Sequence, residues 1–482
     1  MGGVYKKREK MWIIYLIPII GTILILGLEE KNKIKKIALF TTILTLIVNI
    51  IIFILWDSKI TTIVRIGSIM GIEYGIDGIS LIYMLLTTLI MPICVLVSWN
   101  YINQNIKLYY STLIILELLL LLVFSVLDVL GFYIYYESVL IPMYIIIGIY
   151  GARQEKIKAA YYFFYYTLAG SILMLISIIY LFITYGTTNY FTLLSLIPSN
   201  LPLNIENLLF LGFFMGLAVK IPKFPFHIWL PLAHVEAPLA GSILLAGILI
   251  KLGSYGFIRY VLVLFPNASL YFTPFIYVLA VLGIIYASLT TLRQTDLKRI
   301  IAYSSISHMG YVMLGIFSNT TLGIEGSIIL QVAHGLVSSG LFIIVTLIYE
   351  RHHTRILKYY RGLSIVMPLW ASAFLFLTLA NIGFPLTCNF IGEFSTLVST
   401  LIANTFIGIL ASSGMVFSAA YALFLFNRIS FGSLSPYVSN TSDITRREIY
   451  ILLPLILLTL ILGITPSLLF DPIHLPVQLL LS

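Results

Sequence analysis

Long apolar segments recur along this chain of 482 residues, and they constrain its fold more than any other feature. Each run of about 20 apolar residues is long enough to cross a hydrocarbon core of about 30 Å as a helix. Hydrophobic residues make up 60% of the chain and charged residues only 10%. A transmembrane barrel would instead show short alternating segments. The pattern therefore predicts an all-α, polytopic membrane protein.

We expect about 14 transmembrane helices joined by short connections. Their expected ranges are 11–29, 36–56, 79–100, 110–127, 129–150, 158–184, 207–234, 239–260, 271–292, 298–317, 323–349, 365–400, 404–430 and 449–470. The N-terminal segment resembles a signal peptide, but no small-residue cleavage site follows it, so we expect an uncleaved span. The two cysteines, Cys94 and Cys388, lie in apolar spans and predict neither a disulfide nor a metal site.

The positions of the basic residues support this helix count and indicate an orientation. With the N-terminus outside, 18 of the 28 lysines and arginines fall in inner loops, 7 fall outside and 3 lie within spans. This bias follows the positive-inside rule, although the basic cluster at the N-terminus opposes it. The net charge of +9 therefore reflects membrane topology, and we expect contact with lipids and none with nucleic acid.

Two expected spans, 207–234 and 365–400, do not fit a single straight helix. Residues 207–220 would rise only about 21 Å at about 1.5 Å per residue, and Pro222 follows them. The second span is too long for one crossing, and Gly383, Phe384 and Pro385 interrupt it. Two broken helices in separated parts of a chain are typical of inverted repeats with a site at the breaks. We therefore expect one integral membrane domain, 1–482, with five-helix repeats at 110–260 and 271–430.

Few ionisable residues lie in the expected spans, and such residues point to function because they are costly there. Lys220 stands directly before the first helix break. Glu137, in the fifth span, is its candidate ion-pair partner. A nearby carboxylate stabilises the charged form of a buried lysine, so a changing Glu137–Lys220 separation would load or release a proton. The alternative for Glu137 is a protonated side chain that hydrogen-bonds between helices.

Four further residues are candidate proton carriers. Lys251 lies mid-span and is a candidate central relay; the alternative is a snorkelling lysine. Glu393 follows the second break, either as the end of a relay or as a helix cap. His308 and His334, with serines nearby, are able to order water and pass protons, whereas a lone buried histidine is usually structural. No spacing among these residues predicts a metal site.

Three segments together resemble the antiporter-like subunits of respiratory complex I. They are VKIPKFPFHIWLPLAHVEAPLAGSILLAGILIKLGSYGFIR, LTTLRQTDLKRIIAYSSISHMGYV and NIGFPLTCNFIGEF. Two more segments, GIDGISLIYMLLTTLIMPICVLVSW and FYIYYESVLIPMYIIIGIYGAR, favour the mitochondrial subunit-4 branch over its two sister subunits. The resemblance runs from about residue 70 to the end.

The resemblance implies a 14-helix fold with two inverted repeats and a role in moving protons across the mitochondrial inner membrane. It implies a subunit of an NADH:ubiquinone reductase without redox chemistry of its own, so FMN, iron–sulfur clusters and ubiquinone would lie elsewhere in the complex. The implied partners are other membrane-arm subunits, including two sister antiporter-like subunits. We expect the N-terminus on the intermembrane-space side. The residues with implied proton-transfer roles are Glu137, Lys220, Lys251, His308, His334 and Glu393.

Two positions depart from the family pattern. Lys223 stands where the family usually has an apolar residue, and Leu232 stands where it often has an acidic one. Lys223 would disfavour the charged form of Lys220 if the two ammonium groups were close. Glu117 is a weaker candidate that bridges helices. Two other functions remain open: a subunit of a multi-subunit sodium/proton antiporter, and a passive scaffold between pumping subunits.

Overall fold

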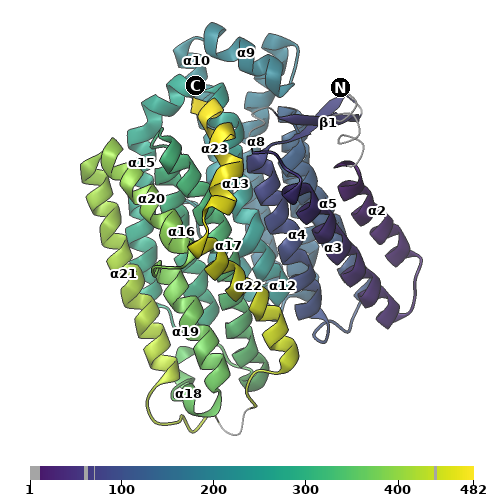
Figure 1. Cartoon of the computed structure of the whole chain (residues 1–482), viewed down its shortest axis with the longest axis vertical. Helices are drawn as coiled ribbons and strands as arrows, with labels where there is room; N and C mark the ends of the chain where they lie inside the picture. The colour runs from purple at the N-terminus through teal and green to yellow at the C-terminus, as the bar shows by residue number, and fades with distance from the viewer. Residues whose placement is uncertain (1–10, 59–62, 70, 439–441, 482) are drawn as a thin grey trace.

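The computed structural model describes residues 11–58, 63–69, 71–438 and 442–481, which form a bundle of long helices (Figure 1). Eleven helices in these ranges are long and apolar enough to cross a membrane. The prediction of an all-α, polytopic membrane protein is therefore confirmed. The count of 14 helices and the two repeats stay predictions.

The described part of the chain begins with four helices and a small hairpin. These elements are α2 (Ile13–Leu26), α3 (Lys31–Ile54), β1 (Val64–Ile69), β2 (Ile72–Ile76), α4 (Gly78–Ser98) and α5 (Ile106–Ser125). The antiparallel hairpin was not predicted, and it lies at the same end of the bundle as the helix Tyr190–Asn200, labelled α9 (Figure 1). Asp77 caps α4 by accepting from the backbone N–H of Ser80, and it also contacts Arg259 at 2.6 Å.

The next helices surround the first break. They are α6 (Val129–Ser138), α7 (Leu140–Tyr150), α8 (Lys156–Tyr185), α9 (Tyr190–Asn200), α10 (Leu203–Lys220), α11 (Trp229–Glu236), α12 (Leu239–Leu244), α13 (Ile250–Gly256) and α14 (Leu262–Leu264). The expected helix break is present between α10 and α11. Two π-helical turns, Leu245–Leu249 and Phe257–Val261, flank α13, where Lys251 lies. Such turns often occur at functional sites.

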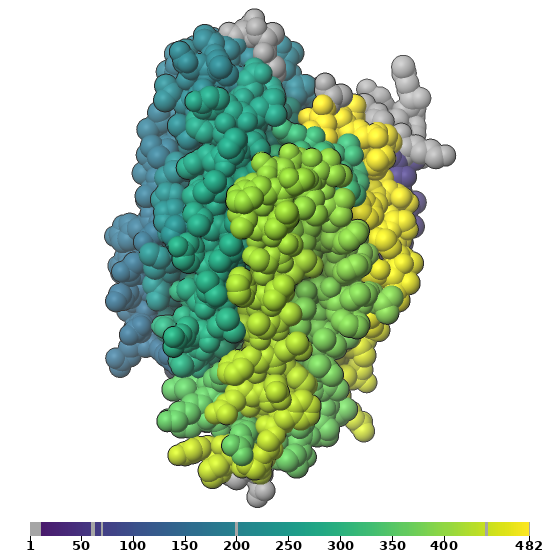
Figure 2. Space-filling model, turned by 90° about the vertical axis from the view of Figure 1, so that its left-hand side faces the viewer, coloured from purple at the N-terminus to yellow at the C-terminus, as the bar shows by residue number. Residues whose placement is uncertain are grey.

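The remaining helices surround the second break. They are α15 (Pro266–Arg293), α16 (Leu297–Ile316), α17 (Thr321–His352), α18 (Leu363–Val366), α19 (Pro368–Ile382), α20 (Cys388–Ala403), α21 (Thr405–Ser430), α22 (Arg446–Ile464) and α23 (Ser467–Leu481). The most apolar window of α17 is wholly buried, so this helix forms the centre of the bundle. By contrast, α21 and α15 share an outer face (Figure 2).

The expected last span, 449–470, is wrong at its C-terminal end. Helix α22 ends at Ile464 and a further helix, α23, begins at Ser467. Thr465 precedes a proline, which disfavours helical geometry at that residue and ends α22. A Cβ on Gly463 would lie 2.2 Å from the carbonyl oxygen of Leu386, so the end of α22 packs on the break between α19 and α20.

Candidate functional site

Lys220 lies at the C-terminal end of α10 and is almost fully buried. Its Nζ donates to the backbone carbonyl of Tyr136 at 2.7 Å and lies 3.3 Å from the centroid of the same residue's ring. The C-terminal end of a helix carries partial negative charge, and an aromatic face also attracts a cation. The backbone and one tyrosine therefore hold this ammonium group, and no carboxylate of the described residues pairs with it within 4.0 Å.

Glu137 lies beside Lys220 but does not form the expected direct ion pair. The two side chains interact electrostatically. However, they are not among the ion pairs of 4.0 Å or less that join described residues. Oε1 of Glu137 is buried and has no hydrogen-bond partner among the described residues. The structure therefore brings the two residues to one place as a separated pair.

The other four predicted residues form one continuous group, which we call the central file: Lys251, His334, His308 and Glu393. Lys251 Nζ lies 2.9 Å from Nδ1 of His334 and also donates to the carbonyl of Ala246. The rings of His334 and His308 have centroids 5.5 Å apart. Nδ1 of His308 lies 2.9 Å from Oε1 of Glu393, although the ring N–H is not aligned for a hydrogen bond.

Four different helices supply the central file, and every member is at most 1% exposed. Lys251 comes from α13, and the others come from α17, α16 and α20. Two protonated groups 2.9 Å apart would repel strongly in this buried place, so Lys251 and His334 are suited to share one extra proton. A neutral imidazole accepts a proton at one nitrogen and releases one at the other. The geometry therefore suits proton transfer.

Apolar packing separates Lys220 from the central file. Helix α10 packs directly on α13, where a Cβ on Gly253 would lie 2.5 Å from Cγ1 of Ile221 and 2.7 Å from the carbonyl oxygen of Leu217. The hydrogen bonds of Lys220 and Lys251 go to different groups. A proton that passes between the two lysines therefore needs water or a side-chain movement.

The sequence reasoning missed two polar residues beside the central file. Asn381 places Oδ1 3.1 Å from Nε2 of His308, so both ring nitrogens of this histidine face oxygen atoms. Gln331, one turn before His334 on α17, accepts from the hydroxyls of Tyr83 and Ser254. Gln331 could have been found from the sequence, because it is a polar residue one helical turn away from a mid-span histidine.

Lys223 is held by a different helix from the one that holds Lys220. Its ammonium group donates to the backbone carbonyl of Met309 on α16 at 2.9 Å, whereas that of Lys220 bonds to α6. Lys223 is 4% exposed, and none of the ion pairs between described residues includes it. The two lysines therefore form their hydrogen bonds with different helices.

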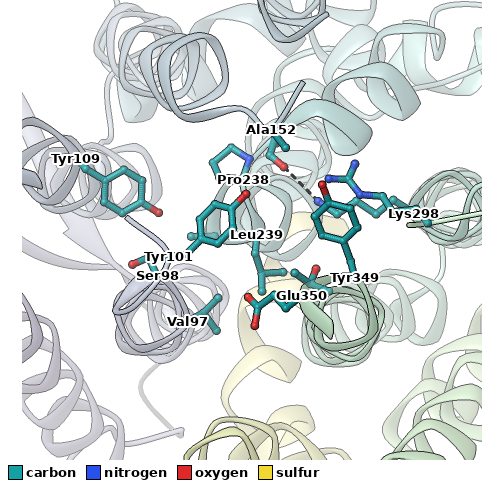
Figure 3. Close-up of a pocket in the computed structure, with 14 residues that line it drawn as sticks. Val97, Ser98, Tyr101, Tyr109, Ala152, Pro238, Leu239, Lys298, Tyr349 and Glu350 are labelled. Carbon is teal, nitrogen blue, oxygen red and sulfur yellow. Dashed lines mark hydrogen bonds between the residues drawn. The ribbon is translucent and has the colours of Figure 1, made fainter. Parts of the chain in front are cut away.

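A small cavity opens at the end of the bundle opposite the hairpin, and we call it the Tyr109 pocket (Figure 3). Tyr109, Ser98 and Tyr101 lie on one side of it, and Lys298 and Glu350 lie on the other. About 20 Å³ is open to the centres of water molecules, room for one or two waters. The pocket therefore brings solvent next to buried titratable side chains.

His234 lies between this pocket and the central file. It is fully buried and stacks on Phe342 with centroids 4.7 Å apart, and in the described part of the chain neither ring nitrogen has a hydrogen-bond partner. It interacts electrostatically with both Lys298 and Lys251. Its free nitrogens suit a bridging water.

Comparison with known proteins decides the family. Residues 126–418 match the family described as "NADH:quinone oxidoreductase/Mrp antiporter, TM". NADH-ubiquinone oxidoreductase chain 4 of Metridium senile is 48% identical over 96% of this chain and 97% of that protein. The protein of the same name from Chondrus crispus is 51% identical over 95% of each. The chain belongs to the NADH-ubiquinone oxidoreductase chain 4 family.

Solved structures agree with this family assignment. A chain of respiratory complex I from Thermus thermophilus superposes with a TM-score of 0.88 at 29% identity, covering 97% of this chain and 98% of that one. A chain of the Mrp complex from Dietzia sp. DQ12-45-1b also has a TM-score of 0.88, at 18% identity and with 98% and 97% coverage. The second similarity establishes a shared fold alone.

Proposed function

We propose that this chain is a proton-translocating membrane-arm subunit of a mitochondrial NADH:ubiquinone oxidoreductase. The observation that carries the proposal is the central file, in which four buried titratable side chains from four helices meet. Buried ionisable residues of this kind mark proton and ion pathways in membrane proteins. The names of the relatives from Metridium senile and Chondrus crispus support the same role.

Protons would move along the file by exchange between neighbouring side chains. His308 would take a proton from one side and pass it to His334 while Glu393 stabilises its charged form. His334 and Lys251 would then share the proton across 2.9 Å. The separated Glu137–Lys220 pair would act as a gate, because a closer carboxylate favours the charged lysine and a more distant one releases its proton.

The driving force would come from the rest of the complex. Export against the membrane potential costs about 2.3 kcal/mol for each charge per 100 mV. Electron transfer from NADH to ubiquinone, with FMN and iron–sulfur clusters in other subunits, would supply it. A charge change in a neighbouring subunit would reach this chain through the Glu137–Lys220 pair, whose side chains are not in direct contact.

The proposal includes an orientation and an internal symmetry. The N-terminus would lie on the intermembrane-space side of the inner membrane, so the Tyr109 pocket would face the matrix. Ranges 110–260 and 271–430 would be inverted five-helix repeats. Their support is that each range contains a broken helix with an ionisable side chain beside the break. Lys220 ends α10 in the first range, and in the second a Cβ on Gly383 would lie 2.6 Å from Oε2 of Glu393. Two sister antiporter-like subunits would flank the chain.

The test uses the assembled complex in sealed vesicles. Lys251→Ala should abolish most proton pumping and slow coupled ubiquinone reduction, while electron transfer from NADH to an artificial acceptor stays normal. Lys158→Ala is the matched control, because Lys158 is exposed. Full pumping by an assembled Lys251→Ala complex would refute the proposal. Purification of the chain without flavin or iron–sulfur subunits would instead favour the antiporter function.

A further inference from the structure

A second group of buried polar side chains lies among the N-terminal helices, away from the central file. Its centre is Glu117 on α5, which is fully buried. Thr45 on α3 contacts Oε1 of Glu117 at 2.6 Å, and no cation in the described ranges pairs with this carboxyl group within 4.0 Å. An ionised carboxylate without a cation is very costly in such a place. The proposed function gives this residue no task.

The hydrogen-bond count at Thr45 indicates which partner carries the proton. The Thr45 hydroxyl lies 2.6 Å from Glu117 and 2.9 Å from the backbone carbonyl of Thr42. A hydroxyl has one hydrogen to donate and can also accept. If Thr45 donates to the helix carbonyl, then Glu117 must donate to Thr45. A protonated carboxyl group therefore satisfies both short contacts.

The second oxygen of Glu117 indicates that a water molecule binds in this group. Oε2 is buried and has no hydrogen-bond partner in the described ranges, and the same holds for Oδ1 of Asn49, one turn after Thr45 on α3. Asn49 is held in place because its amide donates to the hydroxyl of Thr88 on α4 at 3.1 Å. Two buried acceptor oxygens without donors in one polar group suit a bridging water.

Polar groups on α4 and α5 lie between this group and the Tyr109 pocket. Cys94 interacts electrostatically with Glu117, and its backbone carbonyl accepts from the hydroxyl of Ser98 at 2.9 Å. Ser98 and Tyr109 both line the pocket (Figure 3). The hydroxyl of Tyr109 is buried, and no described residue forms a hydrogen bond with it. Polar groups thus extend from the solvent-accessible pocket towards Glu117 without passing through Lys251 or His334.

We propose that Glu117 is a second proton-binding carboxyl group, which exchanges its proton with water in the Tyr109 pocket by way of Ser98 and Tyr109. In this step a water-borne proton forms an O–H bond on Glu117 and neutralises its carboxylate. The reverse step returns the proton to the same pocket. Glu117 is thus a proton store on a side branch, and the inference stands independently of the proposed relay.

Infrared difference spectroscopy of the purified complex tests the inference. The wild-type protein should show the C=O band of a protonated carboxyl group that is missing in Glu117→Gln. Thr45→Val should shift this band, because it removes the hydroxyl that contacts Glu117. In heavy water, Tyr109→Phe should slow the deuterium shift of the band roughly tenfold, since the proton then lacks a relay hydroxyl. Tyr349→Phe, which changes the other side of the pocket, should not slow it.

Two results would overturn the inference. Identical carboxyl bands in wild type and Glu117→Gln would mean that Glu117 is ionised. Equal exchange rates in Tyr109→Phe and Tyr349→Phe would mean that the proton does not reach Glu117 through this pocket. If Glu117→Gln fails to assemble, the Thr45→Val shift still decides the protonation state. A Glu393→Gln complex should keep the band, which separates this inference from the proposed relay.

Discussion

Glu393→Gln removes a negative charge 2.9 Å from Nδ1 of His308 and keeps the size of the side chain. Both side chains are at most 2% exposed, so solvent does little to screen their attraction. At an effective dielectric constant of about 20, two unit charges at this distance attract by about 6 kcal/mol. The protonated form of His308 loses this stabilisation in the variant.

The expected result is a large loss of pumping. If only about 2 kcal/mol of the lost attraction appears in the barrier for loading His308, that step slows roughly 30-fold. The assay is the initial rate of proton transport in sealed vesicles, measured together with NADH oxidation. Glu393→Asp keeps the charge and should retain more pumping than the glutamine variant. Pumping above half of the wild-type rate in an assembled Glu393→Gln complex would refute the role of this contact.

Three other substitutions test separate parts of the structure. Gly253→Ala places a methyl group 2.5 Å from Ile221, so it should destabilise the complex by about 1–3 kcal/mol and reduce pumping, measured by thermal inactivation and vesicle assays. Lys223→Met removes a buried cation that pairs with no carboxylate in the described ranges, so it should keep pumping and leave thermal stability equal or higher. Arg259→Ala leaves Asp77 buried without its 2.6 Å partner and should cost about 3–5 kcal/mol in thermal denaturation.

Each of these has a control. Gly283→Ala is the match for Gly253, because a Cβ at Gly283 meets nothing within 4 Å, and equal losses would contradict the packing argument. Loss of pumping in an assembled Lys223→Met complex would show that this amine carries protons. Adding Asp77→Ala to Arg259→Ala should recover part of the lost stability, and no recovery would mean that the ion pair is not the cause.

Residue type alone was enough to find the members of the central file. Lysine, histidine and glutamate are rare inside apolar spans, so Lys251, His308, His334 and Glu393 stood out. Their pairing was not predictable from spacing, since 83 residues separate Lys251 from His334 and 85 separate His308 from Glu393. Contacts of this kind depend on how helices distant in sequence rotate against each other. The prolines did predict where α10 and α19 end.

The expected Glu137–Lys220 ion pair shows the limit of such reasoning. The ammonium group bonds to the carbonyl of Tyr136, one residue before Glu137. A displacement of one residue lies within the error of any helix rotation inferred from sequence. The hairpin had a usable signal, namely two short β-rich segments around Gly71, which has a φ of +83°. The hairpin was not predicted because apolar residues on both sides of it continue the transmembrane pattern.

The burial of the central part of α17 has a consequence for how the chain is made. Its centre touches no lipid in the finished protein, yet it carries Gln331 and His334. During synthesis, α17 leaves the ribosome before α20, the neighbour that later supplies Glu393. Lipid cannot satisfy these polar side chains in the meantime. Insertion of α17 is therefore coupled to the arrival of later helices, and a translation pause before residue 388 would expose the chain to quality-control proteases.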